Sequence, residues 1–175
     1  MKRNLLYVLF AAVLLGTALH YAINAGATPA SGFTATTLAK GTLGSFEVFN
    51  HFVPPNVSED DEKEIWLSWQ KTKGESDLYV QSNVWAPGGS TGWHTHPGHS
   101  LIIVTAGTLT AYEGHDPTCT PHVYTAGMGF VDPGGSHVHI IRNEGNVAAQ
   151  NIAIQLIPAG QPRRIDAPDP GNCHF

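Results

Sequence analysis

Of the ten histidines in this chain, five lie in two short segments whose spacing is that of metal ligands. In the first segment, His94 and His96 are two residues apart, and His99 follows a Pro-Gly pair. In the second, His137 and His139 have the same spacing. Side chains two residues apart on a β-strand point to the same face, and neutral imidazole binds zinc, copper, iron and nickel. The first pair is therefore half of a metal site, and one histidine of the second pair can complete it.

Strands have to carry these histidines, and the sequence from residue 77 onward predicts such strands. Short apolar stretches alternate with breaks rich in glycine and proline, of which the chain has 19 and 12. Closely spaced short strands with turn signals are typical of a sandwich or a barrel. With 42% hydrophobic and 13% charged residues, the chain can close one core. The predicted strands are residues 78–85, 92–96, 100–105, 108–112, 122–124, 129–131, 137–142 and 147–157.

The segment before these strands has weaker patterns. Residues 28–44 are small and polar, which indicates a flexible lead-in. Residues 45–53 predict a strand that ends at Pro54. Residues 57–70 open with Ser58 and a run of acidic side chains, as many helices do, although an extended loop fits this stretch as well. We therefore expect one short N-terminal helix at most.

The N-terminus is typical of an export signal. Two basic residues precede an apolar run over 5–15, and Ala-Gly-Ala at 25–27 suits a signal peptidase. We predict a signal peptide over residues 1–27; the alternative is an uncleaved membrane anchor over residues 5–23. In both cases the body of the protein lies outside the cytoplasm, secreted or periplasmic. A membrane is a partner only if the leader is retained.

The chain has two cysteines, Cys119 and Cys173, and neither has the spacing of a metal ligand. An oxidising compartment favours a disulfide between them, which would fasten a proline-rich tail over residues 161–175. Such a bridge closes a loop of about 54 residues and contributes about 4 kcal/mol in the chain-entropy model. The alternative is two free thiols.

Charge and motifs exclude other classes of protein. The net charge is −5 and lysine and arginine cluster nowhere beyond the first three residues, so we expect no nucleic-acid partner. The glycine-rich turns lack the lysine and helix of a phosphate loop. The remaining histidines of the body have no ligand-like spacing, and we expect them on the surface or in loops; they are His51, His115, His122 and His174.

Both histidine segments resemble the two sequence motifs of the cupin superfamily, and the chain looks like a single-domain, type-2-like member with an export signal. The first motif contains Gly, His-x-His, Glu and Gly, and the second contains Gly, Pro-x-Gly, His and Asn. The second motif has one extra residue here, ahead of its histidine. The resemblance implies an all-β fold, a double-stranded β-helix or jelly-roll barrel, over residues 45–160. The matching residues are Gly88, His94, His96 and Gly107, then Gly127, Pro133, Gly135, His139 and Asn143.

The resemblance implies that His94, His96 and His139 are metal ligands. The fourth cupin ligand, a glutamate, is missing, because Ser100, or Leu101 at the longer spacing of the motif, stands at its position. A site of three neutral imidazoles leaves coordination positions open for water, dioxygen or a chelating substrate.

Two further histidines have open roles near this site. His99 stands beside the missing glutamate and is a fourth ligand, a hydrogen-bonding neighbour of the ligands or an exposed turn residue. His137 replaces His139 if the extra residue shifts the strand register, although the spacing to Asn143 favours His139.

For function, the resemblance implies a divalent metal, one of iron, manganese, zinc, copper and nickel, and a small-molecule substrate or ligand. Three-histidine iron sites occur among thiol dioxygenases of the same superfamily, so metal-dependent dioxygenase chemistry is the leading hypothesis, followed by isomerase or decarboxylase chemistry. The alternatives are a non-catalytic module that binds a small ligand or metal, and a structural barrel whose metal only fastens strands. Cupins commonly dimerise, so a homo-oligomer is compatible with the resemblance.

Overall fold

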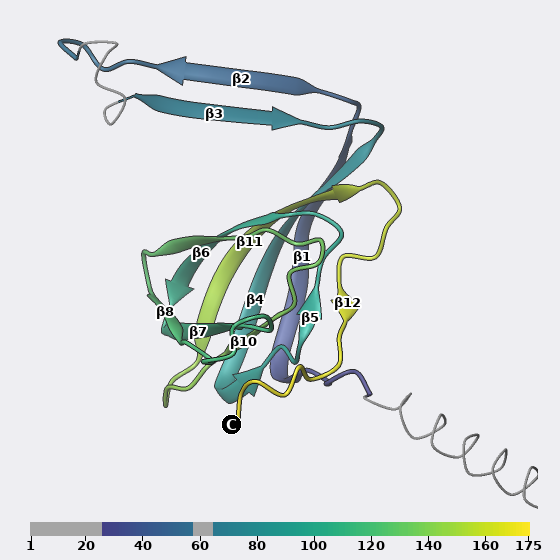
Figure 1. The fold of residues 1–175 in the computed structure, drawn as a ribbon, viewed down its shortest axis with the longest axis vertical. Helices are drawn as coiled ribbons and strands as arrows, with labels where there is room; N and C mark the ends of the chain where they lie inside the picture. Colours follow the sequence, from purple (N-terminus) through teal and green to yellow (C-terminus); the bar gives the residue numbers. More distant parts are fainter. Residues whose placement is uncertain (1–25, 58–64) are drawn as a thin grey trace, which may run out of the picture.

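The computed structural model describes residues 26–57 and 65–175, and every regular element within these ranges is a β-strand (Figure 1). The predicted all-β fold is confirmed, and each strand predicted from residue 77 onward has a counterpart. The strands are β1 (Ser31–Leu43), β2 (Glu47–Phe52), β3 (Trp66–Lys71), β4 (Ser76–Ser90), β5 (His94–Thr95), β6 (Ser100–Ala106), β7 (Thr108–Glu113), β8 (His122–Thr125), β9 (Gly129–Asp132), β10 (His139–Arg142), β11 (Ala149–Pro158) and β12 (Ile165–Asp166).

Ten of these strands form one antiparallel sheet that curls into a nearly closed barrel, the double-stranded β-helix (Figure 1). Hydrogen-bonded neighbours follow the order β12-β5-β10-β4-β11-β6-β9, with β1 beside β4 and β7 between β10 and β8. Strand β4 joins the two walls of the barrel. It pairs with β11 from Ser76 to Trp85, and its last residue, Ser90, pairs with Arg142 of β10.

Strand β1 occupies most of residues 28–44, so the flexible lead-in predicted there is wrong for that stretch. It pairs antiparallel with β4, and the ring centroid of Phe33 lies 4.8 Å from that of Trp85. Most other β1 side chains face water, and a half-solvated strand carries small and polar residues. Composition alone therefore did not separate this strand from a loop. The remaining domain boundaries stay predictions.

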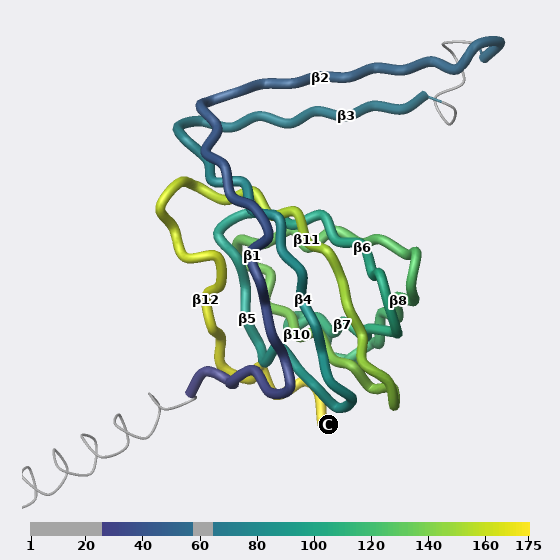
Figure 2. Tube along the Cα trace, turned by 180° about the vertical axis from the view of Figure 1, so that it is seen from behind, coloured from purple at the N-terminus to yellow at the C-terminus, as the bar shows by residue number. Residues whose placement is uncertain are grey.

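Strands β2 and β3 form a separate two-stranded sheet that projects from the barrel (Figures 1 and 2). Strand β2 confirms the strand predicted at residues 45–53. The helix predicted at residues 57–70 is wrong over 66–70, which belong to β3; residues 58–64 lie outside the described residues. Aromatic side chains such as Trp69 favour strands, and here they outweigh the helix-start pattern that precedes them.

The C-terminal tail is fastened along the strand that carries His94. Strand β12 pairs with β5, and the backbone N–H of Ala167 donates to the carbonyl of Trp93 (3.0 Å). The predicted disulfide between Cys119 and Cys173 is confirmed, with 5.3 Å between the Cα atoms. Cys173 packs in a buried cluster with Trp93, Tyr112, Ile140 and Ala167. The tail is therefore part of the wall around β5.

The predicted signal peptide falls almost entirely on residues outside the described ranges and stays a prediction. Within those ranges, no helix has the length and apolar character needed to cross a membrane.

Candidate metal centre

Three histidine rings meet inside the barrel because two short strands pair directly. His94 on β5 is the register partner of His139 on β10, and His96 follows one residue after β5. The ring centroids are 4.3 Å apart for His94 and His139, 4.8 Å for His94 and His96, and 5.5 Å for His96 and His139. One nitrogen from each ring lies within 4.8 Å of the others. His94 is 4% exposed and His139 is 5% exposed, so the cluster is shielded from water.

Hydrogen bonds behind the rings set which nitrogen faces the barrel interior. His94 Nδ1 lies 3.0 Å from the carbonyl oxygen of Gly92, and His96 Nδ1 lies 2.5 Å from that of Arg163. A carbonyl oxygen only accepts, so both Nδ1 atoms donate, and in the neutral rings each Nε2 carries a lone pair. His139 Nε2 is buried without a hydrogen-bond partner. This is the outer-shell arrangement that orients histidines toward a metal.

The environment keeps two of the rings neutral. Burial lowers the pKa of His94 well below its ordinary value, and the neighbouring His139 acts in the same direction. Burial also lowers the pKa of His139, although the nearby Asp132 carboxylate partly opposes this shift. A neutral imidazole is the form that binds a metal, so these rings are ready to act as ligands without first losing a proton.

A carboxylate that sequence analysis missed lies beside the rings. Asp132, the last residue of β9, is 4% exposed. Its Oδ2 lies 3.1 Å from His96 Nε2 and 3.7 Å from His139 Nε2, while its Oδ1 accepts from the N–H of Gly134 (3.0 Å). Burial acts to raise the pKa of Asp132, but the contact with His96, the proximity of His139 and the N–H of Gly134 outweigh it, so the pKa is lowered. Asp132 is therefore ionised near neutral pH.

The other predicted residues lie in different places. Ser100 is buried on β6 and lines the same cavity as the rings. His99 lies outside that cavity, with its Nε2 3.3 Å from Gln70 Nε2. His137 Nδ1 lies 3.0 Å from the Glu113 carboxylate, and its ring contacts that of His115. Of these candidates, only Ser100 shares the cavity with the histidine cluster.

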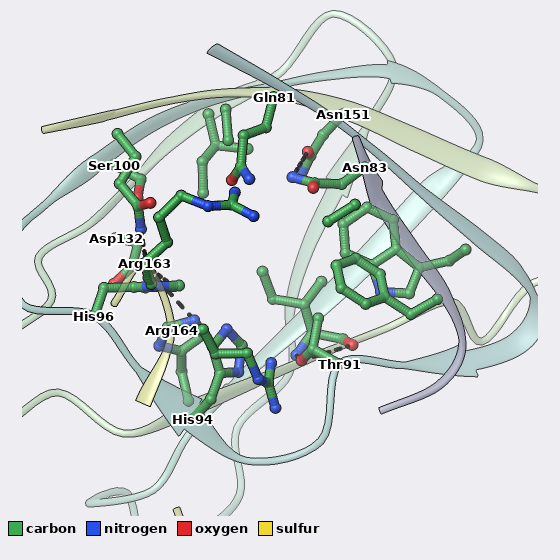
Figure 3. Close-up of a pocket in the computed structure, with 18 residues that line it drawn as sticks. Gln81, Asn83, Thr91, His94, His96, Ser100, Asp132, Asn151, Arg163 and Arg164 are labelled. Carbon is green, nitrogen blue, oxygen red and sulfur yellow. Dashed lines mark hydrogen bonds and ion pairs between the residues drawn. The ribbon is translucent and has the colours of Figure 1, made fainter. Parts of the chain in front are cut away.

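The cavity next to the cluster measures about 110 Å³, and its far wall carries the polar side chains of Gln81, Asn83 and Asn151 among apolar ones (Figure 3). The side-chain N–H groups of Gln81, Trp85 and Asn151 are buried there without hydrogen-bond partners. Figure 3 shows the Arg163 side chain reaching from the histidine side into the cavity toward Gln81. A ligand between the two walls would thus meet nitrogen lone pairs at one end and N–H donors at the other.

The donor set fits a divalent metal ion. The Nε2 lone pairs of His94 and His96, the third ring nitrogen and a carboxylate oxygen converge in a buried space, and His139 Nε2 and Asp132 Oδ2 have no hydrogen-bond partner there. Buried acceptors that face one another are destabilising unless a cation or proton lies between them. Imidazole with carboxylate suits zinc, iron, manganese, copper and nickel, so the residues do not select one metal.

In a comparison with known families, residues 83–155 match the family described as "Cupin domain". This range contains both predicted motif segments and all three clustered histidines. A comparison with curated proteins found no match.

Several solved structures resemble the barrel over about half of the chain. An uncharacterised protein with a double-stranded β-helix domain from Klebsiella pneumoniae is 20% identical, with 51% of this chain and 74% of that one covered and a TM-score of 0.44. A cupin superfamily protein from Desulfitobacterium hafniense is 18% identical, with 46% of this chain and 67% of that one covered and a TM-score of 0.40. A predicted oxalate decarboxylase from Thermotoga maritima is 20% identical, with 49% of this chain and 83% of that one covered and a TM-score of 0.39. None of these likenesses says what this chain acts on.

Proposed function

This chain belongs to the cupin superfamily, and we propose that it is a small metalloenzyme that holds one divalent metal ion on His94, His96 and His139. The observation that carries this proposal is the set of inward-facing imidazole nitrogens. Two rings are turned by bonds from Nδ1 to backbone carbonyls, and the third has a buried Nε2 without a partner. Groups held in this way bind a metal with little reorganisation, which favours a resident ion.

The leading reaction class is dioxygenation of a small molecule, with isomerase or decarboxylase chemistry next. A metal in this position would supply a Lewis acid with coordination sites left for substrate and dioxygen. Iron and manganese suit the redox hypothesis, while zinc, copper and nickel fit the same ligand atoms. The protein contributes a buried cavity, fixed ligands and two imidazoles, those of His94 and His139, whose pKa burial lowers.

The far wall of the cavity favours a substrate rich in oxygen acceptors, such as a small organic acid. The unpaired N–H groups of Gln81, Trp85 and Asn151 need acceptors, and burial makes each unmade bond costly. Arg163 adds a guanidinium, whose fork of donors matches a carboxylate. A cavity of about 110 Å³ limits the buried part of such a ligand to a few heavy atoms.

An extracytoplasmic location is part of the proposal. The N-terminal sequence is typical of an export signal, and the Cys119–Cys173 bridge is of the kind that persists in oxidising compartments.

Metal analysis of the purified protein tests this function. The protein is prepared without affinity-tag histidines, and its metal content is measured by mass spectrometry alongside His94→Ala, His96→Ala and His139→Ala variants. We expect about one divalent metal per chain in the wild type and a large loss in each variant. Oxygen consumption is then followed over a panel of small carboxylic acids and thiols.

The outcomes separate the candidate functions. Bound redox metal with substrate-dependent oxygen uptake supports the enzyme. Bound metal without oxygen uptake, carbon dioxide release or isomer formation supports the non-catalytic module instead. A wild-type protein that takes up no divalent metal after reconstitution contradicts the proposal.

A further inference from the structure

The glutamate missing from the first cupin motif has a carboxylate directly across the sheet from its position. Ser100, which stands where the glutamate would be, is the register partner of Asp132 in the antiparallel pair β6 and β9. Residues directly opposite each other in such a pair point to the same face, with Cβ atoms about 5 Å apart. A carboxylate lost from β6 and placed on β9 therefore still faces the barrel interior. Both residues are buried, and both line the histidine cavity.

From this placement we infer that Asp132 is the carboxylate ligand of the metal centre and replaces the missing glutamate from the neighbouring strand. The inference rests on the proposed metal site and adds its fourth protein ligand. It also gives the site the charge of a three-histidine, one-carboxylate cupin centre, since one anion offsets half of a divalent cation.

The distances around Asp132 Oδ2 suit a shared ion. This oxygen lies 3.1 Å from His96 Nε2 and 3.7 Å from His139 Nε2. Two ligand atoms each about 2.1 Å from one metal are about 3.0 Å apart at a right angle and about 3.4 Å apart in a tetrahedron. The separation of 3.1 Å from His96 falls within this range, and the separation of 3.7 Å from His139 lies slightly above it.

The chemistry of His96 supports an ion in that space. Its Nδ1 donates to the Arg163 carbonyl, so in the neutral ring Nε2 is an acceptor that faces another acceptor, Asp132 Oδ2. Lone pairs at this distance repel unless a positive charge lies between them. A metal supplies that charge for both His96 and His139; a proton on His96 would supply it for His96 alone.

The local backbone holds Asp132 in this position. Asp132 Oδ1 accepts from the N–H of Gly134, which leaves Oδ2 free to face the rings. Gly134 has φ of +66°, and a Cβ there would lie 2.2 Å from the carbonyl oxygen of Gly98. The turn after β9 is thus packed against the loop that joins the first histidine pair to Ser100. This contact holds Asp132 close to β6, the strand on which Ser100 stands in place of the glutamate.

A carboxylate swap tests the inference. We compare the wild type with Asp132→Asn, with the double variant Asp132→Ser and Ser100→Glu, and with the control Glu113→Gln, which removes a carboxylate beside a histidine outside the cavity. Dissociation constants for Zn(II) are measured by chelator competition, and the visible spectrum of bound Co(II) reports the ligand set. Thermal unfolding of the metal-free proteins shows that each variant is folded.

We expect Asp132→Asn to weaken Zn(II) binding about 100-fold or more and to change the Co(II) spectrum. The double variant should recover binding to within about tenfold of the wild type, and Glu113→Gln should leave it unchanged. Wild-type affinity and spectrum in Asp132→Asn would overturn the inference, as would a double variant no better than Asp132→Asn. Absence of metal from the wild type would instead contradict the proposed function itself.

Discussion

Among the described residues, two groups of side chains each bring three candidate ligand atoms within 4.8 Å of one another, and the groups differ in their burial and in their contacts. The inner cluster is His94, His96 and His139, inside the cavity. The rim cluster is Glu113, His115 and His137, of which His115 is exposed and the other two are half-buried. The clusters are adjacent in the sheet, because Glu113 on β7 is the register partner of His139 on β10.

The difference lies in what the ligand atoms already contact. In the rim cluster, His137 Nδ1 lies 3.0 Å from a Glu113 oxygen, so this donor and acceptor satisfy each other. In the inner cluster, His139 Nε2 has no partner, and carbonyl groups behind His94 and His96 turn Nε2 inward. Proximity of ligand atoms is therefore weak evidence for a metal site. Unpaired, buried and oriented acceptors are stronger evidence, because water and side-chain partners cannot satisfy them instead.

The largest expected effect comes from a matched pair of substitutions two residues apart. His139→Ala should remove most of the bound metal, because it deletes one of three imidazole ligands from a buried site. His137→Ala should leave the metal content unchanged, because His137 belongs to the rim cluster. Metal content by mass spectrometry distinguishes the two. Loss of metal in His137→Ala with retention in His139→Ala would reverse our assignment of the clusters.

Removal of the disulfide should have the next largest effect on the protein, because the tail that it fastens contacts both clusters. The tail it fastens supplies the Arg163 carbonyl behind His96, and Asn172 on the same tail donates to the Glu113 carbonyl (2.9 Å). Replacing both cysteines by serine should cost about 4 kcal/mol of unfolding free energy in the chain-entropy model.

Metal affinity tests the coupling between tail and site in the double serine variant. It should fall about tenfold, since outer-shell partners of ligands contribute on this scale. Urea unfolding measures the stability and chelator competition measures the affinity. An affinity equal to that of the wild type in a destabilised variant would show that the tail does not hold His96 in place.

A smaller effect should appear in the pH dependence of the metal-free protein. The pKa of His94 is lowered in the folded state, so below the unfolded value of about 6.5 the unfolded chain binds protons that the folded chain does not. Stability should therefore fall as pH drops from 7 to 5. In His94→Gln this loss should be smaller, because no imidazole is present to be protonated. Melting temperatures of the metal-free proteins across this range provide the measurement, and parallel curves would contradict the shift.

The sequence was sufficient for features that depend on local spacing and insufficient for features that depend on strand pairing. The two motif segments identified the three rings that meet, because a strand places alternate residues on one face. Asp132 was missed because its relation to Ser100 exists only across the register of β6 and β9. The Arg163 carbonyl was missed for the same reason, since a backbone group leaves no mark in the residue pattern. Strand β1 was missed because its pairing with β4, rather than its composition, makes it a strand.

The smallest expected effect is in the rim cluster itself. Glu113→Gln removes the charge from a pair in which the His137 side chain is 38% exposed and the Glu113 side chain 26%. Pairs in such wet positions contribute about 0–1 kcal/mol, so the change in unfolding free energy should stay within that range. Asp132 is only 4% exposed, and Asp132→Asn should weaken metal binding far more than Glu113→Gln does. If urea unfolding shows that Glu113→Gln lowers the unfolding free energy by several kcal/mol, the rim cluster is a structural element of the barrel. The contrast between the inner cluster and the rim cluster would then no longer hold.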